Sequence, residues 1–153
     1  MALDDDIRIL SGVALFDGLS ADQLRLLAFG AERMQLAAGE ALYSEGDRAD
    51  TAFVIVSGRI ALYRDQGDTR RELGSAGPGA LLGEFALIAP TRRMTGASAQ
   101  RESELIRLDR KQFRRILEEY PEIAAALHAR IAGELQDMIR KIEALAPRLA
   151  PDD

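Results

Sequence analysis

The sequence predicts one mainly β domain, a jelly-roll-like β-barrel (a double-stranded β-helix) flanked by helices. The length of 153 residues fits a single domain. From about residue 32 to residue 108, short apolar stretches alternate with glycine-containing turns, as in all-β sandwiches and barrels. Before and after that region, apolar residues recur at helical spacing. We therefore divide the single domain 1–153 into N-terminal helices (1–30), a β-barrel (31–108) and C-terminal helices (109–146).

The first 30 residues carry helix signals. Ser20 and Gln23 have the spacing of a capping box. Gly30 is a typical helix stop, so the pattern predicts a helix over residues 21–29. The acidic opening Asp4-Asp5-Asp6 is interpreted as the solvated start of an earlier helix, where the helix dipole favours negative charge.

The middle region contains five apolar stretches that predict strands: ALY (41–43), TAFVIVS (51–57), RIALY (59–63), MTGASA (94–99) and ELIRL (104–108). Turn signals separate these stretches, such as Glu-Gly-Asp at 45–47 and Gly-Pro-Gly at 77–79. The Ser57-Gly58 step joins two β-rich runs, and the sequence predicts a hairpin there.

The C-terminal region predicts two helices. Asp109 is placed to cap a helix over about 110–118, and Pro121 fits the first turn of a longer helix that ends at Pro147. From 121 to 145 that helix would be about 37 Å long, which is more than a small barrel covers. Its apolar stripe either docks on the barrel or self-associates. We expect a homodimer with a seam formed by Ile131, Leu135, Met138 and Ile142.

Composition argues against several classes of function. The chain contains no cysteine, which excludes disulfides, thiolate zinc sites and cysteine nucleophiles. A single histidine, His128, makes a histidine metal site or a Ser-His-Asp triad hard to build. Glu45, Asp47 and Asp50 lack the full ligand set of an EF-hand and are interpreted as a solvated turn. We therefore expect no metal, no cofactor and no catalytic residue.

Charge and hydropathy indicate where the chain acts. The longest apolar run is far shorter than the ~18–20 residues that span a bilayer, and MALDDDIRIL has acids where a signal peptide is positive. We expect a cytoplasmic protein without membrane insertion. The net charge of −5 suits a polyanion poorly, and the residues after Pro147 are too few for a DNA-reading domain. We therefore expect no DNA binding.

The stretch GEFALIAPTRRMTG (83–96) is the best candidate for a ligand site. A Gly-Glu pair that starts a helical turn inside a barrel offers backbone N–H groups, and such helix starts attract phosphate. An arginine on the following strand would add a charge-assisted contact, and Glu84 would accept a hydrogen bond from a neighbouring hydroxyl. A phosphate beside a sugar hydroxyl is the mark of a nucleotide-like ligand.

This stretch resembles the phosphate-binding cassette of cyclic nucleotide-binding domains, found in catabolite activator proteins, protein kinase A regulatory subunits and cyclic nucleotide-gated channels. The run from Gly83 to Leu87 matches the start of the cassette, and Arg93 follows Glu84 by nine residues, as in kinase-type cassettes. LFDGLSADQLRLLA (15–28) and GEALYSEGDRADTAFVIVSGRIALY (39–63) occur in the order typical of the family. The resemblance extends over about residues 12–145.

The resemblance implies a role for each cassette residue. Glu84 would accept the ribose 2′-hydroxyl, Arg93 would bind the cyclic phosphate, and the backbone N–H of Met94 would assist. The backbone of Gly83, Phe85 and Ala86 would face the ribose and the phosphate. Two positions depart from the family pattern: Met94 replaces a small residue, and Gly96 stands where a β-branched residue is common. Thr95 would supply a hydroxyl near the pocket, one position late.

Two alternatives stay open at the cassette, and the residues that contact the base lie outside it. Arg92 would take the role of Arg93 if the loop were shifted by one residue. Glu84 would pair with the arginine if the pocket were an inherited one that binds nothing. Contacts to the base would come from the long helix, near Gln136, Asp137 or Arg140.

The sequence therefore predicts a non-catalytic sensor that binds a cyclic nucleotide, cAMP rather than cGMP because Met94 lacks a hydroxyl for guanine. The competing prediction is a ligand-free member of the same fold that acts as a protein-interaction or dimerisation module. An enzyme is the weakest hypothesis, since no nucleophile–base pair emerges.

Overall fold

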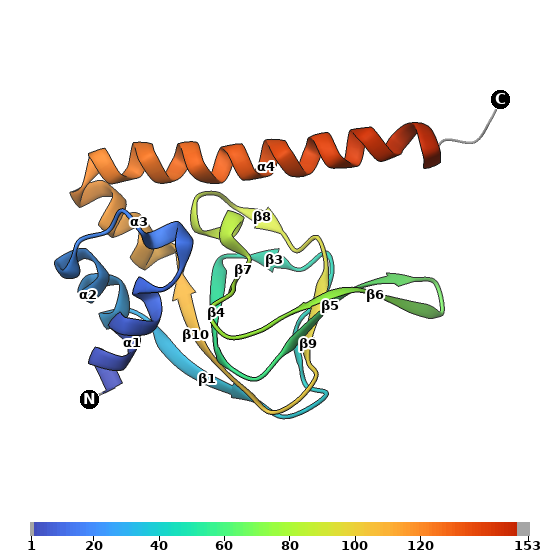
Figure 1. The fold of residues 1–153 in the computed structure, drawn as a ribbon, viewed down its shortest axis with the longest axis horizontal. Coiled ribbons are helices and arrows are strands. Elements are labelled where there is room, and N and C mark those ends of the chain that lie inside the picture. Colours follow the sequence, from blue (N-terminus) through green and yellow to red (C-terminus); the bar gives the residue numbers. More distant parts are fainter. Residues whose placement is uncertain (1, 150–153) are drawn as a thin grey trace.

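Two four-stranded antiparallel sheets form the barrel of this computed structural model, which describes residues 2–149 and the side chains of residues 3–140. The strands are β1 (Glu32–Leu36), β2 (Ala41–Tyr43), β3 (Arg48–Ala49), β4 (Thr51–Ser57), β5 (Ile60–Gln66), β6 (Thr69–Ala76), β7 (Leu81–Leu82), β8 (Thr91–Arg92), β9 (Gly96–Ala99) and β10 (Ser103–Asp109). One sheet has the order β1-β10-β4-β7, the other has the order β2-β9-β5-β6, and β3 pairs with β8 in a short ladder (Figure 1). The predicted jelly-roll-like barrel is confirmed.

Strand β4 divides the apolar core into two parts because its side chains alternate between two faces. Phe53 and Ile55 point into the barrel, whereas Ala52 and Val54 pack against the helices. All four residues are buried, and this explains why TAFVIVS reads as a nearly continuous apolar run. The barrel core and the helix-side core therefore share β4. This strand begins at Thr51, beside the candidate site.

The predicted hairpin at Ser57-Gly58 is wrong. β4 pairs with β10 and β7, whereas β5 pairs with β6 and β9, so this turn carries the chain from one sheet to the other. Gly58 has φ 92°, and a Cβ there would collide with Ser103 on the neighbouring strand. A glycine lets the chain pass close to β10 at this corner.

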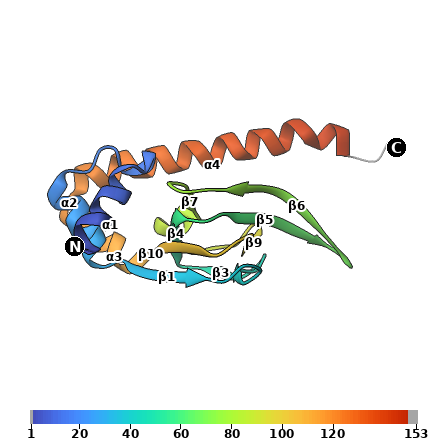
Figure 2. The ribbon, with the colours of Figure 1, turned by 60° about the horizontal axis from the view of Figure 1, so that its bottom comes forward.

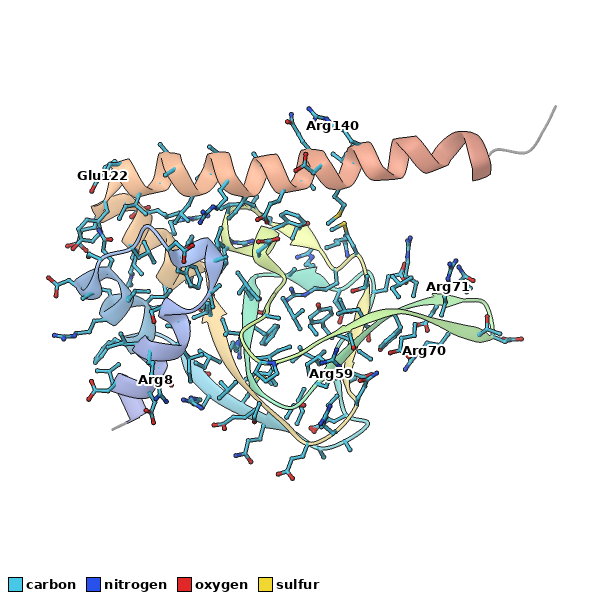
Figure 3. All side chains as sticks on the ribbon, viewed as in Figure 1. Arg8, Arg59, Arg70, Arg71, Glu122 and Arg140 are labelled. Atoms are coloured by element: carbon cyan, nitrogen blue, oxygen red, sulfur yellow. The ribbon has the colours of Figure 1, made fainter. Side chains whose placement is uncertain are left out.

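The real hairpin is β5–β6, at the Gln66-Gly67-Asp68 turn, where Gly67 has φ 65°. The strand β6 has the sequence TRRELGSA, whose residues are almost all exposed. It has no apolar alternation, which is why the sequence does not predict it. The hairpin extends beyond the rest of the barrel, with Arg70 and Arg71 near its end (Figure 3).

The N-terminal segment forms α1 (Ala2–Ser11), the short 3₁₀ helix η1 (Ala14–Phe16) and α2 (Ala21–Phe29). The predicted bounds of α2 and its capping box are confirmed, since the Ser20 hydroxyl accepts from the Gln23 N–H and the Gln23 side chain accepts from the Ser20 N–H. Together with α3, these helices cover one end of the barrel (Figure 2).

The interpretation of Asp4-Asp5-Asp6 as a solvated start is correct for the first two residues and wrong for Asp6. Asp6 is 7% exposed and forms an ion pair of 2.6 Å with Arg33 of β1. Arg33 also pairs with Glu104 of β10 at 2.7 Å. The three side chains tie α1 to the sheet.

The C-terminal helices are α3 (Arg110–Glu119), capped by Asp109 as predicted, and α4 (Pro121–Leu149). The predicted stop at Pro147 is wrong because α4 continues to Leu149. Proline has a helical φ, and so close to the end of α4 its missing N–H and the crowding of the preceding turn affect only the last part of the helix. No helix that the structure describes has both the length and the apolar character needed to cross a membrane.

Helix α4 runs along the outside of the barrel, over the 3₁₀ turn η2 (Glu84–Leu87) and β8 (Figures 1 and 2). Leu127 and Ile131 fix its first half in the helix-side core, where they are 6% and 0% exposed. The Arg130 guanidinium donates to the carbonyl oxygen of Ala14 at 2.6 Å. The helix is therefore anchored on the N-terminal side of Met138, the position from which it reaches the cavity.

Candidate functional site

The cassette lines a cavity of about 280 Å³ between the barrel and α4. All seven cassette residues selected from the sequence contribute to its wall: Gly83, Glu84, Phe85, Ala86, Arg93, Met94 and Thr95. Tyr43 and Leu62 add a barrel-side wall, and Met138 reaches the cavity from α4. The structure therefore brings the predicted site residues together from two separate parts of the cassette.

The turn η2 begins at Gly83, which has φ 76° and ψ 30° in the left-handed region. The N–H of Ala86 donates to the carbonyl of Gly83, so it is used within the turn, while the earlier N–H groups of a helical turn have no partner inside it. Ala86 and Leu87 are buried and hold the turn against the core. Residues 83–85 thus present polar backbone at the edge of the cavity.

Arg93 enters the site from the opposite wall and is 8% exposed. Its Nη2 donates to the carbonyl and the hydroxyl oxygens of Thr51, at 2.8 Å and 3.0 Å. Its guanidinium lies over the ring of Tyr43, 4.3 Å from the centroid. Nε and Nη1 have no hydrogen-bond partner among the described residues. A buried guanidinium with two unpaired donors is costly unless an anion comes to it.

The surroundings of Arg93 have opposing effects on its positive charge. Burial lowers the pKa of this guanidinium, whereas Tyr43, Asp50 and Asp47 raise it. Glu84 is not among these groups, so the pairing of Glu84 with the arginine that we considered for an inherited pocket is not seen in this structure.

Arg92 and Arg93 point in different directions. Arg92 lies on the short β8 strand, is exposed, and donates through Nη1 to the carbonyl of Gly46 at 3.0 Å. The backbone of Arg93 is held in place by the 45–47 turn, since its N–H donates to Asp47 and its carbonyl accepts from Gly46, each at 2.8 Å. The buried arginine is therefore the one that sequence spacing favours.

The acidic residues of the 45–47 turn hold the turn itself. Glu45 accepts from Arg64 and from the Asp65 N–H, both at 3.3 Å, and Asp47 accepts from the Ser44 N–H at 3.0 Å. These hydrogen bonds explain the positions of Glu45 and Asp47 without a bound metal.

Glu84 has an unexpected neighbour on α4. Its carboxyl group is in hydrogen-bonding contact with the carboxyl group of Glu134. Burial raises the pKa of Glu84 to about 8, with further contributions from the hydrogen bond and the charge of Glu134. A hydrogen bond between two carboxyl groups requires that one of them carries a proton.

The two departures from the family pattern have different structural settings. Met94 is 46% exposed at the cavity rim. Gly96 is required by packing, because a Cβ there would overlap the ring of Tyr63, which is 4% exposed. The Thr95 side chain is hydrogen-bonded to Tyr43. The Tyr63 ring thus occupies the space that a β-branched residue would need at position 96.

None of the three residues expected to contact the base, Gln136, Asp137 and Arg140, lines the cavity. Asp137 and Arg140 pair with each other at 3.7 Å on an exposed face, and Arg140 points away from the barrel (Figure 3). At about 100° per residue, position 140 lies roughly 180° around the helix from the buried Ile131. Met138 lies on the inward side and lines the cavity, whereas the exposed Glu134 is not part of the cavity wall. The signal for Met138 was the apolar stripe itself, which had been assigned to a dimer seam.

A larger cavity, of about 480 Å³, shares Arg92 and its strand with the site but lacks the cassette turn and Arg93. Its lining includes Arg48 and Arg110. Because Arg93 with its unpaired donors and the cassette turn line the smaller cavity, that cavity is the candidate site.

Comparison with known proteins decides the family. The model of the cyclic nucleotide-binding domain matches residues 33–120, which is more than half of the chain and includes the whole cassette. The chain belongs to the cyclic nucleotide-binding domain family.

Relatives of this chain contain the matched domain within proteins of very different length. The chain is 28% identical to the cyclic AMP receptor protein of Thermus thermophilus over 90% of its own length and 64% of that protein. It is 30% identical to the rat patatin-like phospholipase domain-containing protein 7 over 74% of its own length and 9% of that protein. The chain therefore spans less than two thirds of these curated relatives.

A solved structure with higher identity is a cyclic nucleotide-binding-like protein from Brucella abortus. It is 56% identical to this chain, has a TM-score of 0.70, and the match covers 75% of this chain and 99% of that one. Membership of the family supports a regulatory role in cyclic nucleotide binding. The individual ligand and the role of each residue are taken up below.

Proposed function

We propose that this chain binds a cyclic nucleotide in the 280 Å³ cavity and acts as a non-catalytic sensor. Arg93 binds the cyclic phosphate, assisted by the Met94 N–H, and Glu84 accepts the ribose 2′-hydroxyl. The backbone of residues 83–86 lies along the sugar and the phosphate. The ligand itself is the only small molecule that this function needs, with no cofactor or metal.

The unpaired donors of Arg93 carry this proposal. Nε and Nη1 are buried and have no partner among the described residues, while Nη2 is fixed by Thr51. A guanidinium held rigidly with two free donors is arranged to receive an anion with two oxygens side by side. A phosphodiester offers such a pair. An inherited pocket without a ligand would retain the cost of the unpaired group without any gain.

The choice of cAMP over cGMP rests on the hydroxyl groups near the base. Position 94 has no hydroxyl, and the Thr95 side chain is already engaged with Tyr43. A guanine amino group, which donates, would therefore find no hydroxyl oxygen at positions 94 and 95 that is free to accept from it.

The sensor's response follows from the position of α4. The cavity is slightly smaller than the ~300–1,000 Å³ typical of ligand pockets, so a nucleotide has to shift Met138, the described α4 side chain that lines it. The ligand shifts the equilibrium between the two positions of α4, with and without nucleotide, only as far as its affinities for these two conformations differ.

Isothermal titration calorimetry with cAMP and cGMP at pH 8 tests the proposal. We expect one site per chain and tighter binding of cAMP. Equal or tighter binding of cGMP contradicts the preference, and no heat or thermal shift with either nucleotide contradicts the function.

A second candidate function, docking on another protein through α4, is favoured by Leu135 and Ile139, which are 37% and 45% exposed. The two lie one turn apart and form a short apolar strip on the helix. We propose that the strip serves a homodimer, which is compatible with nucleotide binding. The net charge of −5 argues against specific DNA binding by this chain, and we propose that it acts in the cytoplasm.

A further inference from the structure

Tyr43 lies against the flat face of the Arg93 guanidinium. The Cζ atom of Arg93 is 4.3 Å from the centroid of the Tyr43 ring and 5.6 Å from that of Phe53, and the two rings stack with their centroids 6.1 Å apart. Tyr43 also lines the candidate cavity. The buried arginine of the site is therefore packed on an aromatic pair that comes from two strands outside the cassette, β2 and β4.

An irregularity in β2 directs Tyr43 toward the barrel. Ala41 is opposite Ser98 and Tyr43 is opposite Ala97, so β2 has one extra residue, Leu42, against β9. A bulge of this kind changes the face to which the following side chain points. Leu42 and Tyr43 are neighbours in the chain, yet both pack against the barrel core, which the regular alternation of a strand would not allow.

The turn that follows Tyr43 also holds the backbone of Arg93. The Ser44 N–H donates to the carboxylate of Asp47 at 3.0 Å and closes the turn. The Gly46 N–H donates to the carbonyl of Arg93, and the Arg93 N–H donates to the carbonyl of Asp47, each at 2.8 Å. The backbones of the two stacked residues are therefore fixed relative to each other by hydrogen bonds that do not involve their side chains.

The stacking contact uses none of the hydrogen-bond donors of Arg93. The N–H groups of a guanidinium lie in its plane, whereas an aromatic ring contacts its face. Nη2 is bonded to Thr51, Nη1 lies beside Gly83 at the cassette turn, and Nε and Nη1 have no partner among the described residues. An acidic side chain in the place of Tyr43 would pair with these donors and compete with a phosphate. An aromatic ring stabilises the charge and leaves the donors free.

We propose that Tyr43 is a positioning residue of the phosphate site, whose ring holds the Arg93 guanidinium in the orientation in which Nε and Nη1 receive the cyclic phosphate. The inference rests on the proposed function of the cavity. It assigns a role to a residue of β2, outside the cassette. Because Tyr43 acts through Arg93, the loss of its ring should matter only while the arginine is present.

Calorimetric titration of single and double variants with cAMP tests the inference. Tyr43→Leu removes the ring and lets Arg93 change rotamer, so the affinity should fall about three- to tenfold, the loss expected when a long side chain has to be ordered on binding. Tyr43→Phe loses only the hydroxyl, which is bonded to Thr95, and keeps the ring, so its affinity should stay within about twofold of the natural value. In an Arg93→Leu background, Tyr43→Leu should cause no further loss.

Leu36→Ala is the control for a general loss of stability. Leu36 is 4% exposed in the same barrel core and is not part of the cavity wall. This variant should lower Tm and keep the natural affinity. A natural affinity in Tyr43→Leu, an equal loss in Tyr43→Phe, or the same loss in the Arg93→Leu background would each overturn the role of the ring. A loss of affinity in Leu36→Ala as large as that in Tyr43→Leu would also overturn it.

The orientation of Arg93 can also be measured without a nucleotide, which separates failure of this inference from failure of the proposed function. In NMR spectra the Nε–H resonance of Arg93, identified by its absence in Arg93→Leu, should be shifted by the ring current of Tyr43. It should move in Tyr43→Leu and stay close to its place in Tyr43→Phe. A resonance that does not move in Tyr43→Leu overturns the positioning of Arg93, whether or not cAMP binds. If the resonance moves as expected and no cyclic nucleotide binds, the proposed function is overturned, and the role of Tyr43 at the phosphate with it.

Discussion

Gly83 and Arg93 are fitted to each other across the cavity. The Nη1 atom of Arg93 lies so close to Gly83 that it would clash with a Cβ there, and Gly83 has the positive φ of 76° that L-residues rarely adopt. The glycine that starts the cassette turn therefore has two physical reasons to be there. It permits the backbone of the turn, and it leaves room for the guanidinium that ends the cassette.

We expect Gly83→Ala to remove nucleotide binding and to lower stability by about 1–2 kcal/mol from the backbone alone. The methyl group would push Arg93 from its place beside Thr51. Gly39→Ala is the matched control, because Gly39 also has a positive φ, of 87°, but has nothing within 4 Å of a new Cβ. It should share the loss in Tm and keep its affinity for cAMP. Equal affinities of the two variants would contradict the fit of Gly83 to Arg93.

Arg93→Leu should weaken cAMP binding far more than Arg92→Leu. A charge-assisted contact to phosphate contributes about 1.5–3 kcal/mol, which corresponds to a loss of roughly tenfold to a hundredfold. Arg92 is exposed and bonded to Gly46, so its loss should change the affinity by less than about threefold. Titration calorimetry compares the two. Similar affinities would mean that the cassette is displaced by one residue or is not used.

The same Arg93→Leu variant should leave stability without nucleotide unchanged or increase it. The buried guanidinium has two unpaired donors, and a leucine at that position would pack against the rings of Tyr43 and Phe53. Replacement of a poorly paired buried charge by an apolar residue is often neutral or stabilising. Melting curves without ligand measure this, and a clear loss in Tm would show that the Thr51 contact outweighs the unpaired donors.

The fold was predictable where burial dictates the sequence pattern. β4 and β10 each lie between two cores and show it as apolar runs, and α2 carries its own cap at Ser20. β6 was missed because it is exposed on both faces. The turn at Gly58 was misassigned because local residues specify a turn but do not specify the sheet that the next strand joins.

The candidate site could be assembled from the sequence where its residues are local. The seven cassette residues form one motif and share one cavity. The partner of Arg93, Thr51, lies 42 residues away, and no spacing rule connects them. The position of Met138 in the cavity wall was missed because the rotation of α4 about its axis is set by Leu127 and Ile131, which pack in the core.

The ion pair between Asp6 and Arg33 should contribute measurably to stability. The Asp6 side chain is 11% exposed and meets the guanidinium of Arg33 through two nitrogens, at 2.6 and 2.7 Å. Asp6→Asn should lower the free energy of unfolding by about 1–3 kcal/mol because it weakens a charged hydrogen bond in a largely buried place. Asp5→Asn, in an exposed pair with Arg8, should change it by less than about 0.5 kcal/mol. Denaturant titrations that give equal values for both would contradict this role.

The structure leaves only part of the expected homodimer seam available to a partner chain. Ile131 is 0% exposed in the chain's own core and Met138 lines the cavity, so neither is available to a partner. Ile142 lies outside the residues whose side chains are described. Leu135 remains, and Ile139, one turn further, joins it on the exposed face.

We therefore expect a dimer in analytical ultracentrifugation at micromolar concentration that dissociates in the double variant Leu135→Glu, Ile139→Glu. Two side chains of the same charge on the strip repel each other and cannot be buried against a second copy without a partner. Phe29→Ser is the control, since Phe29 is 81% exposed at the end of α2, on a different part of the surface. It should leave the dimer intact. A monomer in the natural sequence, with or without cAMP, would contradict the dimer, and a dimer that survives the double variant would place its seam elsewhere.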